Sequence, residues 1–350
     1  MAIDPSKQRS KPKISNFVSE PTKFNTSVKG SYTSWDVVKG QSLPPYPIGR
    51  THTIDKAPSE VSKNIVEGLR RLSVHAICDP VKAEAMCTTS CDCTFKVTLF
   101  AAKEGDKTVM EIMRRRGCGL SYSNAQRAVL RSAQGIYEVE KPRSLSIPKC
   151  IAAKYEAPSM DYLRKILEDS SKELQTNDQS GQLTTLRLIA SMTDARKSHA
   201  QSSIDLSKMI MEGEAGIREI CLNLLRSDST DDFSMRIKRD VLAIFSNCLR
   251  LLNHDQVQEM VNGEDSWCRD VLFPIIVKAI KNCPCPHGCT LLAKCLCVFL
   301  KNVPNLRDEA RKGGDLEAVL DEVIKIGKKT HNNLEVSASY ALRSLWLPTE

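Results

Sequence analysis

The stretch "NCPCPHGCT", residues 282–290, contains three cysteines and a histidine at alternate positions. Thiolates and imidazoles are the usual ligands of structural Zn²⁺, so Cys283, Cys285, His287 and Cys289 are candidate metal ligands. However, all four come from one short loop, whereas structural zinc sites commonly combine two ligand pairs separated in sequence. The two prolines of the stretch end one helix and begin another. A turn between two helices is therefore the favoured interpretation.

A second cysteine cluster, "MCTTSCDC", contains Cys87, Cys91 and Cys93, and the spacing of the first two is compatible with metal binding. No histidine or further cysteine pair lies close to it in sequence, and neither cluster has the Cys-x-x-Cys spacing of a dithiol redox site. The N-terminal "MAIDPSKQRSKPK" has no apolar segment typical of a signal peptide. We therefore expect reduced cysteines, many of them small buried apolar residues, in a cytoplasmic or nuclear protein.

Motifs of the common catalytic sites are missing from the sequence. It has no phosphate-binding loop, no dinucleotide-binding fingerprint and no Gly-x-Ser-x-Gly elbow, and its six histidines have no obvious nucleophile or carboxylate partner. We expect a protein that is not an enzyme and has no cofactor. Arg114–Arg116 in "MRRRG" could contact phosphates, although a solvated strand end is the favoured interpretation.

The elements that would position these residues fall into three segments, which together predict an α+β protein that is mostly α. Residues 1–58 contain seven of the sixteen prolines and nine Lys and Arg against four Asp and Glu. This composition predicts a disordered, basic, Pro/Ser-rich tail. Its "LPPYPIGR" could be a polyproline II ligand, although a linker is the preferred interpretation.

Residues 59–150 are expected to form a small α/β domain with a helix, a three-stranded sheet and a second helix. Val61, Ile65, Leu69 and Leu72 form an apolar stripe after Ser59, a candidate N-cap. "CTFKVTLFA" and "KTVMEIMRRRG" alternate with the period of strands, and residues 73–78 supply the third strand. "SNAQRAVLRSAQG" is then typical of a helix that ends at a glycine.

Residues 155–350 have helical periodicity throughout, with short loops and Gly breaks. The predicted helices are 160–174, 183–195, 200–211, 214–226, 235–252, 255–261, 265–282, 286–302, 305–312, 315–328 and 334–345. The longest apolar run, "TLLAKCLCVFL", is too short to cross a bilayer and contains Lys294, so no membrane partner is expected.

Three stretches of this region share one order of elements: a polar break, an apolar helix, a turn and a second apolar helix. Matching the closing helices aligns Ile244, Cys295 and Ala341, with Ile189 in a more divergent unit. The likeness is clearest in "ARKGGDLEAVLDEVIKIGKKTHNNLEVSASYALRSL". This stretch resembles the armadillo/HEAT superfamily, the ARM-type fold, with its Gly-initiated second helix and Ala-rich third helix. An irregular helical domain is the alternative.

The resemblance implies an armadillo-like scaffold in which third helices line a groove for an extended peptide or another protein. Asn247 matches the asparagine of the ladder found in importin-like members, but Ala243 occupies the tryptophan position, so recognition of nuclear signals is not expected. The groove candidates are Asn247, Arg250, Lys294, Lys301 and Arg343. A basic groove would favour an acidic peptide. The expected function is that of a protein-binding adaptor. Alternatives are a nucleic-acid-associated protein that uses the basic tail and Arg114–Arg116, or a small zinc-binding regulator.

Overall fold

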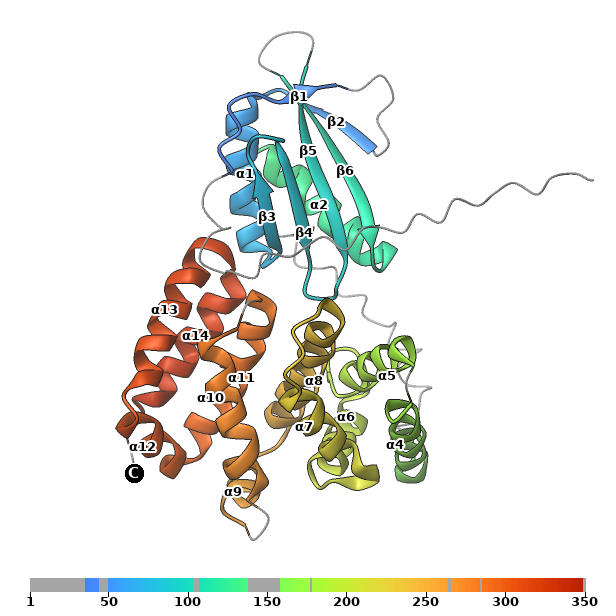
Figure 1. The fold of residues 1–350 in the computed structure, drawn as a ribbon, viewed down its shortest axis with the longest axis vertical. Coiled ribbons are helices and arrows are strands. Elements are labelled where there is room, and N and C mark those ends of the chain that lie inside the picture. The colour runs from blue at the N-terminus through green and yellow to red at the C-terminus, as the bar shows by residue number, and fades with distance from the viewer. Residues whose placement is uncertain are drawn as a thin grey trace, which may run out of the picture.

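The computed structural model describes residues 35–43, 50–102, 107–137, 158–176, 178–263, 266–283 and 285–348. Within these ranges the chain has two parts, a module with a β-sheet and an array of helices, as Figure 1 shows. The predicted mostly helical α+β class is confirmed. The tail before residue 35, the segment "LPPYPIGR" except for Leu43 and Arg50, and residues 138–157 lie outside the described residues.

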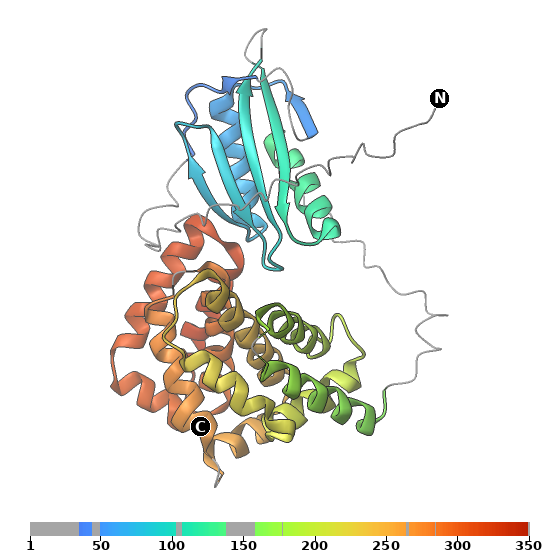
Figure 2. The same cartoon turned by 45° about the vertical axis from the view of Figure 1, so that its right-hand side comes forward.

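The module contains an antiparallel sheet in the order β2-β6-β5-β4-β3, with the short β1 paired in parallel to β5. Its elements are β1 (Gln41–Ser42), β2 (Arg50–Ile54), α1 (Pro58–Arg71), β3 (His75–Asp79), β4 (Glu84–Thr88), β5 (Thr94–Ala101), β6 (Thr108–Arg116) and α2 (Gly119–Ala133). Both helices lie on the same side of the sheet (Figures 1 and 2). They approach closely at Gly68, where a Cβ would lie 2.3 Å from the Cβ of Ser132.

The module core follows from the period of its elements. Phe95, Val97 and Leu99 alternate along β5 and are fully buried, as are Val61 and Ile65 of the stripe predicted on α1. Because successive strand residues point to opposite faces, one face of β5 packs against the helices. Helix α1 begins at Pro58 rather than at a Ser59 cap, and α2 ends before a left-handed glycine as predicted.

The sheet has six strands where the sequence predicted three. Two of the extra strands, β1 and β2, come from residues 41–42 and 50–54, which were assigned to the disordered tail. Trp35 and Val37, also from that segment, are buried in the module core, and the Trp35 Nε1 donates to the Asp79 carbonyl at 3.3 Å. The tail prediction is therefore wrong for these residues, because two apolar side chains and pairing with β6 attach them to the module.

The array extends from Met160 to Leu345. Its helices are α4 (Met160–Leu174), α5 (Gln179–Met192), α6 (Ala200–Met211), α7 (Ile217–Arg226), α8 (Asp232–Leu251), α9 (His254–Asn262), α10 (Phe273–Lys281), α11 (Pro286–Asn302), α12 (Pro304–Lys312), α13 (Asp315–Thr330) and α14 (Asn332–Leu345). Two predicted helices are divided, by a 3₁₀ turn at residues 214–216 and by a π turn at residues 268–272. No single described helix is long and apolar enough to cross a membrane, although α11 and α12, bent by 114°, reach that length and composition together.

The closing helices of the proposed repeat units form a row, α5-α8-α11-α14, in which each helix packs against the next (Figure 1). The residues aligned by the repeat, Ile189, Ile244, Cys295 and Ala341, are all fully buried at the corresponding places of these four helices. Cys297 and Ser344 also lie side by side between α11 and α14, with Sγ and Oγ 3.6 Å apart. The helical array is thus repeat-like, with a common buried position in each closing helix.

Candidate functional site

The cysteine-rich stretch, whose His287 and Cys289 lie in the first turn of α11, does not gather its four candidate ligands around one point. The Cys283 thiol donates to the Cys285 carbonyl at 3.2 Å, and hydrogen bonding from Cys289 lowers the pKa of Cys283. His287 turns toward other groups instead: its Nε2 lies 3.1 Å from the Thr88 carbonyl. Within the described residues, no group of three or more His, Cys, Asp and Glu side chains is placed to hold a metal ion.

The second cysteine cluster covers the end of β4, which contains Cys87, and the tip of the β4–β5 hairpin, residues 89–93. Cys87 and Cys93 are buried and Cys91 is exposed, so the three thiols do not share one surface. Hydrogen bonds from the Asp92 N–H to the Thr89 carbonyl and from the Cys93 N–H to the Thr89 Oγ1, both 3.1 Å, close the turn. Asp92 occupies the left-handed region at φ 63°, which aspartate adopts more readily than most residues. This turn directs the Asp92 carboxylate out of the module and toward the array.

Four arginines surround the Asp92 carboxylate, and we call the three from the array, Arg187, Arg236 and Arg239, the arginine seat. The shortest nitrogen–oxygen distances to Asp92 are 2.6 Å from Arg187 on α5 and 2.8 and 3.5 Å from Arg236 and Arg239 on α8. Arg116 of the module's own β6 lies 3.2 Å away. Only 5% of the Asp92 side chain is exposed. Burial opposes its ionisation, but the surrounding arginines outweigh burial and hold the pKa of Asp92 below its usual value.

The arginine seat carries more positive charge than its carboxylates neutralise. Asp240 on α8 pairs with Arg187 at 3.1 Å and with Arg239 at 3.3 Å, so one anion of the array serves two of the three cations. The Nε of Arg236 is buried and has no hydrogen-bond partner among the described groups. Burial above all, and then Arg116 and Arg187, lower the pKa of Arg236 by more than Asp92 and Asp232 raise it. The single carboxylate that the module supplies, Asp92, therefore does not neutralise all the positive charge of the arginine seat.

A second polar contact between module and array runs through two buried histidines. The Thr88 carbonyl can only accept, so the His287 Nε2 carries a hydrogen and its Nδ1 accepts from the His331 Nε2, 3.1 Å away. Nearby, the backbone N–H of Asn333 donates to the Ser73 Oγ at 2.8 Å, and Ser73 has a φ of 55°. The module thus contacts the array at the starts of α11 and α14 as well as at α8.

The arginine seat and the predicted groove lie along the same helix faces. On α8, Arg236, Asp240, Ala243, Asn247 and Arg250 follow each other at intervals of four and three residues, the spacing of one helical face. The fourteen steps from Arg236 to Arg250 correspond to about 21 Å along the axis. The module therefore covers the N-terminal end of this face of α8, and the remaining turns extend beyond it.

The same arrangement recurs on α11, where His287, Leu291, Lys294, Val298 and Lys301 share one face. His287, at the start, contacts the module, whereas Lys294 and Lys301 lie two and four turns further on. The C-terminal parts of these two helix faces carry Arg250 on α8 and Lys294 and Lys301 on α11. We call the surface that these three residues form the basic face.

Predicted groove residues fall into two groups in the structure. Asn247 uses its amide inside the array, where Nδ2 donates to the Ala190 carbonyl at 3.0 Å and thereby ties α8 to α5. The other four are cations with no ion pair to any described residue: Arg250, Lys294, Lys301 and Arg343. Burial, Arg250 and Arg196 all lower the pKa of Lys294, so positive charges gather at this point of the basic face. Arg343 is exposed on α14.

The predicted phosphate contact at Arg114–Arg116 is partly engaged within the protein. Arg116 binds Asp92 and lies 3.6 Å from Asp232 of α8, and the Arg114 Nη1 donates to the Gly117 carbonyl at 3.3 Å. Arg115 is exposed. Of these three residues, Arg116 contributes to the junction with the array, which the sequence pattern did not show.

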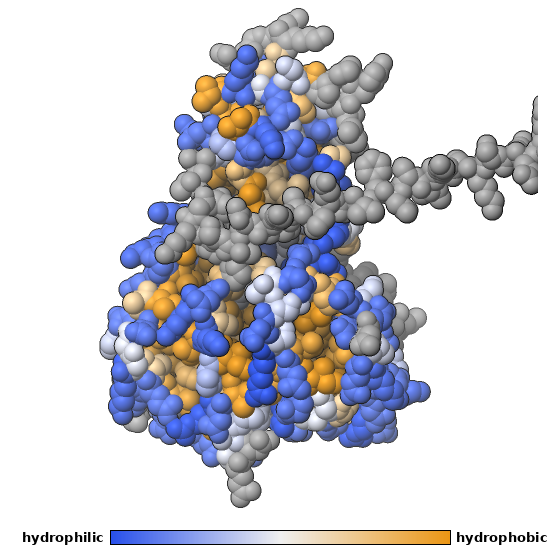
Figure 3. All heavy atoms as spheres, viewed as in Figure 1, coloured by the Kyte–Doolittle hydropathy of each residue, from blue (hydrophilic) through white to orange (hydrophobic). Residues whose placement is uncertain are grey.

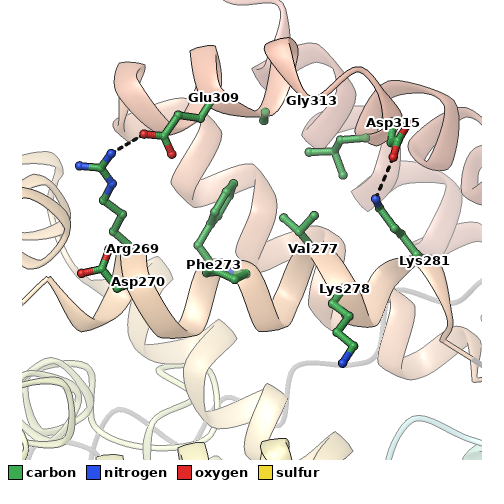
Figure 4. Close-up of a pocket in the computed structure, with 12 residues that line it drawn as sticks. Arg269, Asp270, Phe273, Val277, Lys278, Lys281, Glu309, Gly313 and Asp315 are labelled. Atoms are coloured by element: carbon green, nitrogen blue, oxygen red, sulfur yellow. Dashed lines mark hydrogen bonds and ion pairs between the residues drawn. The ribbon is translucent and has the colours of Figure 1, made fainter.

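A cavity of about 640 Å³ lies between α10 and the pair α12–α13 (Figure 4). Its floor is formed by apolar side chains that include Phe273 and Val277. The ion pairs Arg269–Glu309 and Lys281–Asp315 cross it at its two ends and hold α12 and α13 against α10. Figure 3 shows that apolar side chains also reach the surface over the array, between bands of polar ones. The lining also carries charged side chains: Arg269, Asp270, Lys278, Lys281, Glu309 and Asp315.

Comparison with known proteins gives no family for this chain. No family model, no curated protein and no solved structure matches it. Its function must therefore be argued from the residues of the site.

Four residues of the site were not identified from the sequence: Asp92, Arg187, Arg236 and Arg239. The cluster "RIKRD" at residues 236–240 puts two arginines and an aspartate on adjacent positions of a helix surface, which is a weak signal for an anion site. Asp92 lies between Cys91 and Cys93, and these cysteines pointed to metal binding rather than to an ion pair.

Proposed function

We propose that this protein is a non-enzymatic adaptor whose helical array, armadillo-like in its order of helices, binds an acidic segment of another protein on the basic face. The observation that supports this proposal is the contrast between the two ends of α8 and α11. At the N-terminal end, cations are paired with a carboxylate of the module, whereas Arg250, Lys294 and Lys301 at the other end form no ion pair with any described residue, and the nearby Asp194 is itself paired with Arg196.

The electrostatics favour a ligand with several negative charges. Lys294 is half-buried. Burial, Arg250 and Arg196 lower its pKa by more than the nearby Asp194, which is paired with Arg196, raises it. An anion placed between these side chains would relieve that repulsion and replace lost hydration. Acidic side chains of an extended peptide meet this requirement with successive charges along the face, and charge complementarity of this kind also speeds association.

The dimensions of α8 set the length of the segment. About 21 Å of helix face corresponds to six or seven residues of extended chain. A fluorescein-labelled peptide of seven glutamates is therefore a suitable probe, with binding to the full chain followed by fluorescence anisotropy at low salt.

The double variant Arg250→Gln/Lys294→Gln tests the proposed face. We expect it to weaken binding of the hepta-glutamate about tenfold, because two partly exposed charge pairs contribute together about 1.4 kcal/mol. The matched control is Arg226→Gln/Lys325→Gln, which removes the same charges from α7 and α13, outside the row of closing helices. Equal binding by both double variants would contradict the proposal.

An oligonucleotide arm separates the peptide proposal from nucleic-acid binding. A labelled single-stranded oligonucleotide is also polyanionic, and its logarithmic affinity falls steeply with logarithmic salt concentration. If the oligonucleotide binds more tightly than the hepta-glutamate, and binding depends on Arg114 and Arg115 rather than on Arg250 and Lys294, the adaptor proposal fails.

A further inference from the structure

The two parts of the chain meet through polar contacts and not through a shared core. The buried apolar residues form two separate clusters, one within the module and one within the array. Across the junction lie the Asp92 ion pairs, the Thr88–His287 hydrogen bond, the Ser73–Asn333 hydrogen bond and a long Arg70–Glu335 pair of 3.9 Å. Polar junctions of this kind resemble transient protein–protein interfaces, and their contacts can be exchanged for those of a ligand.

We propose that the arginine seat, Arg187, Arg236 and Arg239, is an anion-binding site that is occupied in this structure by the chain's own Asp92, and that a phosphorylated segment of a partner displaces Asp92 from it. The seat has the features of a built site. Three guanidinium groups converge on one carboxylate, which is almost fully enclosed.

The charge balance favours a phosphate monoester over a carboxylate as the ligand from outside. With Asp92 in place, four arginines, three of the seat and Arg116, face three carboxylates, Asp92, Asp232 and Asp240, which leaves an excess of one positive charge. Asp92 supplies one negative charge, whereas a phosphate monoester carries about −1.5 to −2 near neutral pH together with three strong acceptor oxygens. Its additional acceptors could also satisfy the buried Nε of Arg236, which has no described partner. Arginine is the residue best suited to bind phosphate oxygens in pairs.

The arginine seat lies next to the basic face, which connects this proposal to the proposed function. The peptide test of the seat rests on that proposed function. The seat and the basic face follow one another along α8, about 21 Å from Arg236 to Arg250. One extended segment could therefore place a phosphate in the seat and acidic side chains on Arg250 and Lys294. Asp92 at the hairpin tip would then act as an internal competitor, and the module would move away when the segment binds.

Inorganic phosphate tests the seat independently of any peptide. In the full-chain variant Asp92→Asn the internal anion is lost while the shape of the side chain is kept. We expect about 20 mM phosphate, compared with chloride at equal ionic strength, to raise the Tm of this variant by about 3 °C more than that of the wild type. The control Asp55→Asn removes an exposed carboxylate of the same module and should behave as the wild type.

Two outcomes decide the phosphate experiment. The additional stabilisation should disappear in Asp92→Asn/Arg236→Gln, which also removes one cation of the seat. An equal response of Asp92→Asn and Asp55→Asn to phosphate would overturn the proposal.

A second test uses the wild-type chain and therefore does not depend on the folding of a variant. The probe is an acidic seven-residue peptide with one phosphoserine, compared with the same peptide carrying serine. We expect the phosphorylated peptide alone to accelerate hydrogen exchange at the Asp92 and Cys93 amides, whose hydrogen bonds close the hairpin turn. Unchanged exchange at these amides when the peptide is bound would refute displacement.

The peptide experiment also distinguishes failure of this inference from failure of the proposed function. If Asp92→Asn binds the phosphopeptide about tenfold more tightly than the wild type, internal competition is supported. Binding that depends on Lys294 and Arg250 but not on Asp92 would leave the adaptor function standing and refute the inference. A specific phosphate effect on Asp92→Asn without any peptide binding would keep the anion site and refute the adaptor function.

Discussion

Acidification should destabilise this protein through three histidines near the junction of module and array, the buried His287 and His331 and the half-buried His75. Burial lowers the pKa of His75 and His287 to about 4, and burial and then His287 lower that of His331 to about 3. An unfolded histidine has a pKa of about 6.5, so between about pH 6.5 and 4 the unfolded chain binds protons that the folded chain does not. Stability therefore rises with pH in this window and is lost as the pH falls.

The size of the effect follows from the same values. At about pH 5.5 an unfolded histidine is roughly nine-tenths protonated while the buried ones are almost neutral, which costs about 1.4 kcal/mol for each histidine. Three histidines together lower the free energy of unfolding by about 4 kcal/mol relative to about pH 7.5. Carboxylates protonate mainly below about pH 5 and contribute little in this range.

Urea denaturation at the two pH values measures this difference. Trp35 is buried in the module and Trp267 in the array, so tryptophan fluorescence reports on both parts. In His331→Gln one titrating group is removed, and we expect the loss of stability between the two pH values to shrink by about a third, or about 1.4 kcal/mol.

The variant His199→Gln is the matched control, because His199 is exposed at the start of α6 and should leave the pH dependence as in the wild type. If His331→Gln loses as much stability on acidification as His199→Gln does, the histidine mechanism is refuted.

Three further substitutions test the packing that positions the site. Gly68→Ala should lower the stability of the module by about 1–3 kcal/mol, because the new Cβ would overlap Ser132, and a second change Ser132→Gly should restore most of the loss; thermal unfolding checks both. Phe245→Ala removes a fully buried ring whose centroid lies 6.1 Å from that of the Trp267 ring. It should lower the free energy of unfolding of the array, measured by urea denaturation, by about 3–5 kcal/mol. Asn247→Ala leaves the Ala190 carbonyl without this donor and should cost about 1–2 kcal/mol, while hepta-glutamate binding changes less than in Arg250→Gln/Lys294→Gln. A large loss of peptide binding with no loss of stability in Asn247→Ala would instead place this residue in the binding face.

The helices were predictable because their signals are local. The bounds of α4, α6 and α11 match the prediction at both ends. In α4 the Ser159 hydroxyl caps the first turn, accepting from the Tyr162 N–H at 3.2 Å, and in α11 a proline occupies the first helical position. Apolar side chains three and four residues apart then continue the helix to its end, so a short window of sequence contains most of the information.

The sheet and the arginine seat depend on partners far along the chain, which no local pattern indicates. Strand β2, with the sequence "RTHTI", lacks a run of apolar residues, and it is defined by pairing with β6. Asp92 meets Arg187 and Arg239 across separations of 95 and 147 residues. A carboxylate within a cysteine-rich turn and arginines on separate helices become a site only when the module docks on the array.

Two of the module residues that contact the array, Asp92 and Ser73, are non-glycine residues in the left-handed region, at φ 63° and 55°. Such backbone conformations cost on the order of 1 kcal/mol or more for most side chains, so a glycine would relax both turns. A glycine, however, would remove the carboxylate that the arginine seat binds and the hydroxyl that accepts from the Asn333 N–H. Since the apolar cores of module and array are separate, these polar groups contribute directly to holding the two parts together. We expect docking held in this way to respond more to anions that compete for the arginines than to agents that weaken apolar packing, as control by a charged partner would require.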